Sequence, residues 1–312
     1  MSVRALILKS TGNLYRVCTD TGDVVMANLA GKIRLELRKS TSPVVVGDYV
    51  DIEQSGDSAL ITKIYPRKNY IIRKSLNLSK QTHILAANID QAFLLATLVY
   101  PRTSTGFIDR FLVTTEAYRI PAKIIFNKID LLDDELKKIQ KEVINMYTSI
   151  GYDCVEISAL KKEDIAIITS KLKDKITLLA GHSGAGKSTL VNNIQPNLHL
   201  KTGNLSEIHS KGKHTTTFSE LHKLDAGGYI IDTPGIKELG LVEMKKEEVG
   251  HYFPEFRALM HQCKFNNCTH TNEPHCAVIK ALEEGKIYTE RYHNYLGILN
   301  SEETNWTAWE NK

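Results

Sequence analysis

The sequence "GHSGAGKS", from Gly181 to Ser188, has the residue types and the spacing of a loop that binds phosphate. It matches the pattern G-x-x-x-x-G-K-[S/T] and lies between an apolar segment, "ITLLA", and a stretch expected to be helical. Glycines let the backbone curl so that successive N–H groups face an anion, and the following helix adds its positive end. A plain glycine-rich turn is the alternative, but the Lys-Ser pair favours phosphate binding. Lys187 is then a catalytic candidate that would span the β and γ phosphates, and Ser188 would be a ligand of Mg²⁺.

Two later segments fit the same phosphate chemistry. In "IIDTPG", Asp232 would hold Mg²⁺ through water at the end of a buried strand, and the N–H of Gly235 would meet the γ-phosphate. Alone, Asp-Thr-Pro-Gly also makes an ordinary turn. In "KGKHTTT", a threonine would cover Mg²⁺ when a triphosphate is bound. Thr216 is the candidate there, Thr215 and Thr217 stay open, and a basic solvated loop is a compatible alternative.

The sequence "NKID", from Asn127 to Asp130, has the residues needed to read a guanine base. The Asp130 carboxylate can accept from N1–H and from the exocyclic amine of guanine, whereas adenine would direct a lone pair at it. A buried polar group left unpaired in this way costs about 1–3 kcal/mol, which favours GTP over ATP. Asn127 and Lys128 would brace the pocket. The alternative is that Asn-Lys-x-Asp only begins a helix by capping it.

The sequence "SAL" at Ser158 to Leu160 follows the next expected strand and would support the base through a backbone N–H, although the tripeptide alone carries little information. The candidate GTP-binding residues are therefore Asn127, Lys128, Ile129, Asp130, Ser158, Ala159, Gly181, His182, Ser183, Gly184, Ala185, Gly186, Lys187, Ser188, Thr189, Asp232 and Gly235. Candidate Mg²⁺ ligands are Ser188, Thr216 and Asp232.

The sequence "CKFNNCTHTNEPHC" has the residues of a metal site. Cys263, Cys268, His270 and Cys276 form the pattern C-x₄-C-x-H-x₅-C, and three thiolates with one imidazole suit one structural Zn²⁺ ion. Such a site stabilises a segment that is too small to fold on a hydrophobic core. His261 and His275 are alternative ligands, and unrelated free thiols are the other interpretation.

Composition limits the classes of protein that fit. The longest uncharged apolar run, "AFLLATLV", is much shorter than the ~20 residues that span a bilayer, and the N-terminal apolar stretch is short for a signal peptide. Five cysteines, three of them clustered, favour a reducing compartment over a disulfide framework. We therefore expect a cytoplasmic protein. The net charge is only +4, but residues 1 to 80 carry 13 lysines and arginines against 7 acidic residues.

Residues 1–70 show short strand-like segments separated by turn residues, which predict a small closed barrel of the oligonucleotide-binding (OB) type with a basic face suited to RNA. A barrel that only packs against its neighbour is the alternative. The predicted strands are "VRALILKS", "NLYRVCT", "DVVMANL", "KIRLELR", "DYVDIEQ" and "ALITKIYP". In "KIRLELR", Ile33, Leu35 and Leu37 alternate with charged residues, as in a strand with one buried face.

Residues 71–236 alternate between apolar strands and amphipathic helices, which predicts a parallel sheet covered by helices. Residues 237–312 predict short helices around the Cys-His cluster. In the central region the base-reading loops precede the phosphate loop, whereas most proteins with both have the reverse order. Because such sites are built from loops at the carboxyl ends of neighbouring strands, joining the old termini and opening the chain elsewhere preserves them. The sequence predicts a circularly permuted α/β P-loop GTPase domain.

A basic barrel, a permuted GTPase domain and a Cys-Cys-His-Cys segment together resemble the small ribosomal subunit biogenesis GTPases of bacteria, the RsgA/YjeQ family, over about residues 1 to 300. The resemblance implies binding to the small ribosomal subunit and its rRNA late in assembly. It also implies slow GTP hydrolysis that the subunit stimulates, and help in releasing assembly factors. GTP, GDP and the subunit are then the partners, no membrane is involved, and a monomer is expected. Lys213, where the family often has arginine, is a minor departure.

Ile236 follows Asp-x-x-Gly at the position where many GTPases have a glutamine that orients water. Isoleucine cannot hydrogen-bond, so we predict a slow unassisted enzyme, with His214 as the candidate water-orienting residue because it is polar and lies in the threonine loop. Two other functions stay open. A P-loop kinase would prefer ATP and leaves "NKID" without a purpose, and an RNA-binding scaffold would bind GTP without hydrolysing it.

Overall fold

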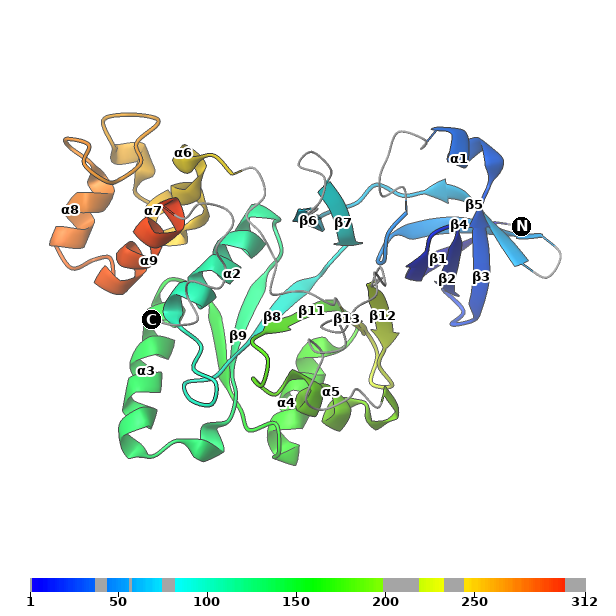
Figure 1. The fold of residues 1–312 in the computed structure, drawn as a ribbon, viewed down its shortest axis with the longest axis horizontal. Coiled ribbons are helices and arrows are strands. Elements are labelled where there is room, and N and C mark those ends of the chain that lie inside the picture. Colours follow the sequence, from blue (N-terminus) through cyan, green and yellow to red (C-terminus); the bar gives the residue numbers. More distant parts are fainter. Residues whose placement is uncertain are drawn as a thin grey trace, which may run out of the picture. The chain divides into compact units, whose positions relative to one another are not determined.

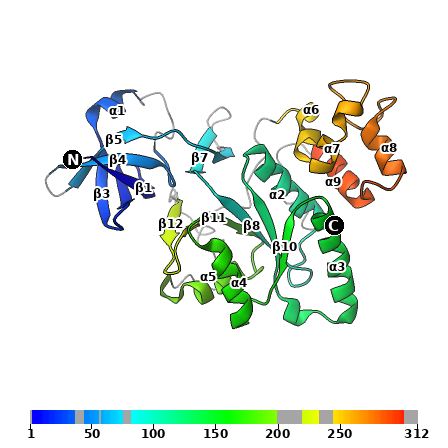
Figure 2. The ribbon, with the colours of Figure 1, turned by 180° about the vertical axis from the view of Figure 1, so that it is seen from behind.

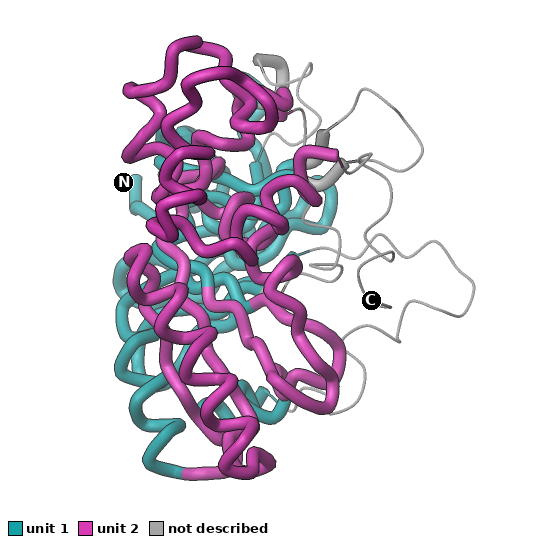
Figure 3. Tube along the Cα trace, turned by 90° about the vertical axis from the view of Figure 1, so that its left-hand side faces the viewer, with its two compact units in different colours: residues 1–92, 162–179, 188–236 teal, residues 93–161, 180–187, 237–312 magenta. Residues whose placement is uncertain are grey.

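The structure is a computed structural model of the 312-residue chain and describes residues 2–36, 44–55, 58–74, 82–198, 219–232 and 244–300. The chain divides into two compact units, shown in Figure 3. Unit 1 comprises residues 1–92, 162–179 and 188–236, and unit 2 comprises residues 93–161, 180–187 and 237–312.

The N-terminal part of unit 1 is a closed barrel of five strands, as predicted. Its strands are β1 (Ser2–Thr11), β2 (Leu14–Thr19), β3 (Val24–Leu29), β4 (Tyr49–Ser55) and β5 (Ser58–Ile64). They follow the order β1-β2-β3-β5-β4, and β4 pairs back onto β1 to close the barrel (Figure 1). Alternate side chains fill the interior, which contains Ala5, Ile7, Tyr15, Val17, Ala27, Val44, Val50, Ile52, Ala59 and Ile61. Closure pairs the first and last strands of the barrel with each other, so neither is left as an open edge of the barrel.

The segment between β3 and β4 corrects the sequence prediction. "KIRLELR" was expected to form a strand, but residues Gly31–Glu36 form the short helix α1, and residues 37–43 lie outside the described residues. Lysine, arginine, leucine and glutamate all have high helix propensity. A run of alternation this short does not distinguish a strand from a short helix.

The rest of unit 1 supplies strands and helices that follow the barrel in sequence. β6 (Tyr70–Lys74) and β7 (Thr82–Ala87) form an antiparallel pair that the sequence analysis did not predict. β11 (Ile176–Gly181) pairs in parallel with β13 (Tyr229–Asp232), β13 pairs with β12 (Glu220–Lys223), and β12 pairs with β1 at Lys9 and Glu220. The helices are α4 (Lys162–Leu172) and α5 (Lys187–Ile194); the last two residues of β11 and the first residue of α5 belong to unit 2.

Unit 2 contains the base-loop strands and their covering helices (Figures 1 and 2). β9 (Ala122–Phe126) lies between β8 (Gln91–Ala96), whose first two residues belong to unit 1, and β10 (Asp153–Glu156), with which it is parallel. All six residues of β8 are buried, which explains the continuous apolar run. α2 (Thr105–Ala117) is capped by the Ser104 hydroxyl, and α3 (Asp134–Ser149) by the Asp133 carboxylate.

The C-terminal part of unit 2 is helical, as predicted, with α6 (Lys246–Val249), α7 (Pro254–Arg257), α8 (Ala277–Glu283) and α9 (Thr289–Asn300). Residues 244–300 are called the Cys-His segment below. Its core combines aromatic residues such as Phe253, Phe256 and Tyr295 with two of the cysteines, and it includes Val113 of α2. Among the described residues, no helix is long and apolar enough to cross a membrane.

Candidate functional site

The glycine-rich loop, Gly181–Lys187, leaves the end of β11 and enters α5. Two of its glycines are required by close approach of other backbone or side-chain atoms. A Cβ on Gly181 would lie 2.4 Å from the carbonyl oxygen of Leu95, and a Cβ on Gly186 would lie 2.3 Å from Nδ2 of Asn127. Both residues also have positive φ, at +141° and +99°, which other residues rarely adopt. The loop therefore needs glycine at these positions to pass so close to the ends of β8 and β9.

Asn127 joins the glycine-rich loop to both predicted base loops. Its Nδ2 donates to the carbonyl oxygen of Ala185 at 2.8 Å, and its Oδ1 accepts from the N–H of Ala159 at 2.9 Å. The Asn127 side chain is buried, as is Ala185. The asparagine amide offers both N–H donors and a carbonyl acceptor at its tip, so a single side chain satisfies both backbone groups. Three segments separated in sequence are thus held together by one amide.

The other base-side residues lie around this junction. Lys128 has a left-handed backbone, with φ of 65°, and its ammonium donates to the carbonyl oxygen of Tyr100. Asp130 lies in a short 3₁₀ turn, Ile129–Leu131, and is exposed to solvent. Ser158 is buried, and its hydroxyl accepts from the N–H of Leu160 at 3.4 Å. The Ala159 N–H donates to Asn127, so that group braces the loops.

Lys187 lies across the glycine-rich loop. Its ammonium donates to the carbonyl oxygens of Gly181 and His182, both at 2.6 Å, so the charge sits inside the curve of the loop. Ser183 and Gly184 are exposed at the tip of the loop. A cation held at the loop by two backbone carbonyl groups suits a ligand with several phosphate oxygens.

The segment after β8 supports the same loop, and the sequence analysis missed it. The ring of Phe107, in the first turn of α2, packs on the imidazole of His182 with 3.9 Å between ring centroids. Pro101 lies against Gly184, where a Cβ would be 3.4 Å from its Cδ. Since β8 is a neighbour of β9, the loop at its carboxyl end belongs to the same edge of the sheet. This rule, applied to the sequence, would have identified the segment after β8 as part of the site.

Several predicted residues lie elsewhere or outside the described part of the chain. Ser188 and Thr189 are the second and third residues of α5, are partly buried and belong to unit 1. Asp232 is the last residue of β13 and pairs with Glu220 through the backbone. His214, Thr215, Thr216, Thr217, Gly235 and Ile236 lie outside the described residues.

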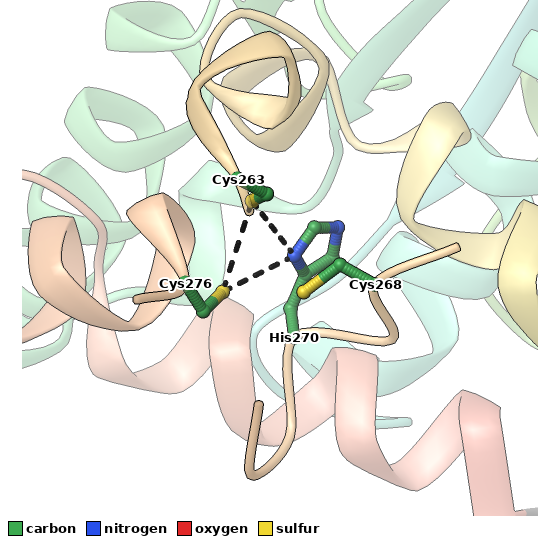
Figure 4. Close-up of side chains that lie close together, drawn as sticks. All are labelled: Cys263, Cys268, His270 and Cys276. Carbon is green, nitrogen blue, oxygen red and sulfur yellow. Dashed lines mark hydrogen bonds between the residues drawn. The ribbon is translucent and has the colours of Figure 1, made fainter. Parts of the chain in front are cut away.

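The predicted metal ligands form one cluster (Figure 4). The Sγ atoms of Cys263, Cys268 and Cys276 and a ring nitrogen of His270 all lie within 4.8 Å of one another. Cys263 Sγ is 4.0 Å from Cys276 Sγ and 3.7 Å from Nδ1 of His270. In tetrahedral Zn²⁺ sites with Zn–S bonds of about 2.3 Å, sulfur atoms lie roughly 3.8 Å apart, so these spacings fit a zinc ion.

The protonation of the cluster also fits a cation. Burial raises the pKa of Cys268 to about 12 and raises the pKa of Cys276. Burial lowers the pKa of His270, which keeps its imidazole neutral, the form that binds metals. Bringing several thiolates together in this buried site requires a positive ion in place of their protons. The donor set is therefore the chemistry that Zn²⁺ takes in closed structural sites.

A carboxylate shapes the loop that carries His270. Glu273 accepts from the N–H and the hydroxyl of Thr269 and from the N–H of Thr271, at 2.6–2.8 Å. Burial raises the pKa of Glu273, but these hydrogen bonds outweigh burial and hold that pKa at about 2. The alternatives His261 and His275 are not in the ligand cluster found among the described residues.

Comparison with known proteins identifies the family. A family model described as the RsgA GTPase matches residues 64–242. The RsgA protein of Bacteroides fragilis strain YCH46, a small ribosomal subunit biogenesis GTPase, is 52% identical over 303 residues, which cover 96% of this chain and 97% of that protein. The chain belongs to the RsgA family of GTPases. The RsgA of Flavobacterium johnsoniae is 50% identical, over 96% of this chain and 94% of the relative.

Two solved structures have the same fold. YjeQ from Thermotoga maritima aligns with a TM-score of 0.81 and 34% identity, covering 96% of this chain and 98% of that one. YloQ, described as a circularly permuted GTPase, aligns with a TM-score of 0.75 and 31% identity, covering 96% and 94%. This chain is likewise a circularly permuted GTPase, a hydrolase acting on GTP. Family membership sets aside the kinase and the non-hydrolysing scaffold.

Proposed function

We propose that one GTP molecule lies across the junction that Asn127 makes, with its base on the loop of Asp130 and its phosphates on Gly181–Ser188. The observation that carries this proposal is the bridge from Asn127 to Ala185 and Ala159, because it places a base-side loop against the phosphate loop. Asp130 is exposed beside the bridge and available to accept from guanine N1–H and the exocyclic amine. Lys187 neutralises the phosphates. Ile129, Ser158, His182, Ser183, Gly184, Gly186, Thr189 and Gly235 complete the proposed GTP contacts.

Two metal ions belong to the proposal. Ser188, Asp232 and Thr216 offer the oxygen ligands that Mg²⁺ prefers, and the ion would offset charge on the phosphates. Cys263, Cys268, His270 and Cys276 would hold one structural Zn²⁺. Its role would be to stabilise the Cys-His segment, whose core includes two of these cysteines.

The partner we propose is the small ribosomal subunit, late in its maturation, with the release of an assembly factor as one outcome. The RsgA relatives are small ribosomal subunit biogenesis GTPases. Residues 1–70 would bind rRNA, 71–236 would hydrolyse GTP, and 237–312 would carry zinc. The barrel surface supports RNA contact: the Arg4 guanidinium lies 4.7 Å and 5.1 Å from the ring centres of Tyr49 and Tyr65, and Lys63 lies over Tyr65. The protein would act in the cytoplasm as a monomer.

Slow turnover without the partner is part of the same proposal. Ile236 follows Asp-x-x-Gly and cannot orient water, and His214 is the proposed substitute. Only residues 233–243 separate Asp232 from the Cys-His segment in the sequence, so a partner bound to that segment would act on the residues around the γ-phosphate. His214→Ala would then lower stimulated turnover.

The test is GTP turnover by the full chain with and without purified small ribosomal subunits, and with large subunits as the matched control. We expect small subunits to raise kcat by about tenfold or more and large subunits to leave it unchanged. A Lys187→Ala variant should lose turnover in every condition. A preference for ATP, or the same rate with and without small subunits, would contradict the proposal.

A further inference from the structure

A buried ion-pair cluster joins the Cys-His segment to α2. Arg291 of α9 is 1% exposed, and its Nη1 donates to Oδ1 of Asp109 of α2, whose side chain is 0% exposed. The rest of the guanidinium donates to Glu255 of α7 at 2.8 Å and 3.1 Å. Burial lowers the pKa of Arg291, but Asp109 and Glu255 outweigh burial and raise it, so the guanidinium stays charged. Figure 1 shows α9 beside α2, and the two helices are in contact.

Asp109 is the point where three helices meet. Besides Arg291, its carboxylate accepts from Nδ2 of Asn294 of α9 at 2.6 Å and from the hydroxyl of Tyr147 of α3 at 2.7 Å. Every donor is fixed by its own helix, and a buried carboxylate that loses a donor cannot recover it from water. Displacing α9 relative to α2 therefore breaks buried charged hydrogen bonds.

The first turn of α2 is fixed by two further contacts. The Thr105 hydroxyl donates to Glu290 of α9 at 2.6 Å, and the Tyr147 hydroxyl lies 3.3 Å from the carbonyl oxygen of Thr105. Two residues after Thr105, the ring of Phe107 packs on His182. His182 in turn accepts from Lys187 through its backbone carbonyl. A continuous series of contacts leads from α9 through the first turn of α2 to the glycine-rich loop.

We propose that Asp109, Arg291 and Phe107 are positioning residues for GTP hydrolysis: through α2 and His182 they transmit the position of the Cys-His segment to the phosphate loop. The inference rests on the proposed function, because it takes Gly181–Lys187 as the loop that holds the GTP phosphates. This route is independent of the link after Asp232. A partner that shifts α9 on binding would change how the loop holds GTP.

The first test is hydrogen exchange of the full chain with GDP bound, read for residues 182–187 and, as an internal reference, for β9. The variants are Phe107→Leu, which keeps an apolar side chain but removes the ring, and Arg291→Lys, which keeps the charge but loses the forked geometry. Arg257→Gln is the matched control, because Arg257 also joins the Cys-His segment to α2, through Glu116 at 3.1 Å, but is 55% exposed.

We expect exchange in the loop to rise about tenfold in both test variants, while β9 and the Arg257→Gln control stay within about twofold of the wild type. The proposal would be overturned if the loop exchanged no faster in Arg291→Lys than in the Arg257→Gln control. An equal rise throughout unit 2 would also overturn it, since that result is a general loss of stability and not a change in position.

The second test is subunit-stimulated turnover. Phe107→Leu and Arg291→Lys should each lower kcat by about tenfold. The kcat of the double variant should be no lower than that of the less active single variant, because the effects of two substitutions on one route are not additive. Losses that multiply in the double variant would refute a shared route. If wild-type turnover does not respond to small subunits, the proposed function fails, whereas the exchange result still decides this inference.

Discussion

Two ion-pair clusters join segments that are distant in sequence, and they differ in their exposure to water. In unit 1, Glu220 of β12 binds Lys9 and Arg16 of the barrel, with side chains that are 19%, 37% and 38% exposed. In unit 2, Arg291 binds Asp109 and Glu255, with side chains that are 1%, 0% and 10% exposed. The barrel contact is open to solvent, whereas the contact of the Cys-His segment with α2 is closed.

This difference determines how firmly each segment is held. An exposed pair gains little because water and salt screen it, and its net contribution is about 0–1 kcal/mol. A buried pair contributes little relative to apolar residues, but removing one partner leaves a charge without water or a counter-ion. The buried cluster therefore resists displacement of α9 from α2, and the exposed one allows the barrel strand and β12 to adjust.

The largest effect is expected from Arg291→Met. This change leaves two carboxylates, Asp109 and Glu255, without their cation and should lower the free energy of unfolding by about 3–5 kcal/mol. Asp109→Asn should cost less, about 1–3 kcal/mol, because Arg291 keeps Glu255 as its partner. The measurement is urea unfolding monitored by the intrinsic fluorescence of the full chain with zinc present.

That experiment is decided by which of the two variants loses more free energy of unfolding. Equal losses for Arg291→Met and Asp109→Asn would mean that the cluster is held by shape and not by charge. High salt should leave both losses unchanged, because buried charges are poorly screened.

The smallest effect is expected from Glu220→Gln, at about 0.5 kcal/mol or less in neutral buffer, and it should vanish in about 1 M salt. Burial raises the pKa of Glu220, but the hydrogen bond from Lys9 and the charge of Arg16 outweigh burial and lower it below 4.5. A lowered folded pKa stabilises the protein above the unfolded pKa and loses that contribution as the pH falls.

Wild type and Glu220→Gln should therefore differ in urea unfolding at pH 7 and converge as the pH falls below 4.5. A difference that persists in acid, or that does not respond to salt, would show that Glu220 belongs to the closed class of contact.

The sequence predicts those features of this molecule that depend on residues close together in the chain. Strand and helix positions from Ile89 to Gly181 follow from apolar runs, caps and turn residues, and the four metal ligands lie within one segment, Cys263–Cys276. "KIRLELR" was misleading because its alternation covers only seven residues, about two helical turns, and the structure places its first five residues in α1. The β6–β7 hairpin was missed because its two strands are separated by residues 75–81, which contain no turn signal of the usual hairpin type.

Contacts between segments that are distant in the chain could not be predicted from the sequence. Asp109 and Arg291 are 182 residues apart in the sequence, and no local pattern indicates that an aspartate within "FIDRFL" is buried. Phe107 has the appearance of an ordinary apolar helix residue, and only the fold places its ring on His182. By contrast, the need for glycine at position 186 was predictable, because the loop pattern requires it. The contact with Asn127 that imposes this need was not predictable.

The most direct test of the account is whether Asp130 reads the base of the nucleotide whose phosphates Lys187 holds. In Asp130→Asn, the side-chain amide would donate to the second carbonyl of xanthine and still accept from N1–H. The measurement is the ratio of the affinities for GDP and for xanthosine diphosphate. We expect the wild type to favour GDP and Asp130→Asn to reverse the preference, a change in the ratio of about a hundredfold or more. An unchanged ratio would contradict the placement of one GTP across the Asn127 junction.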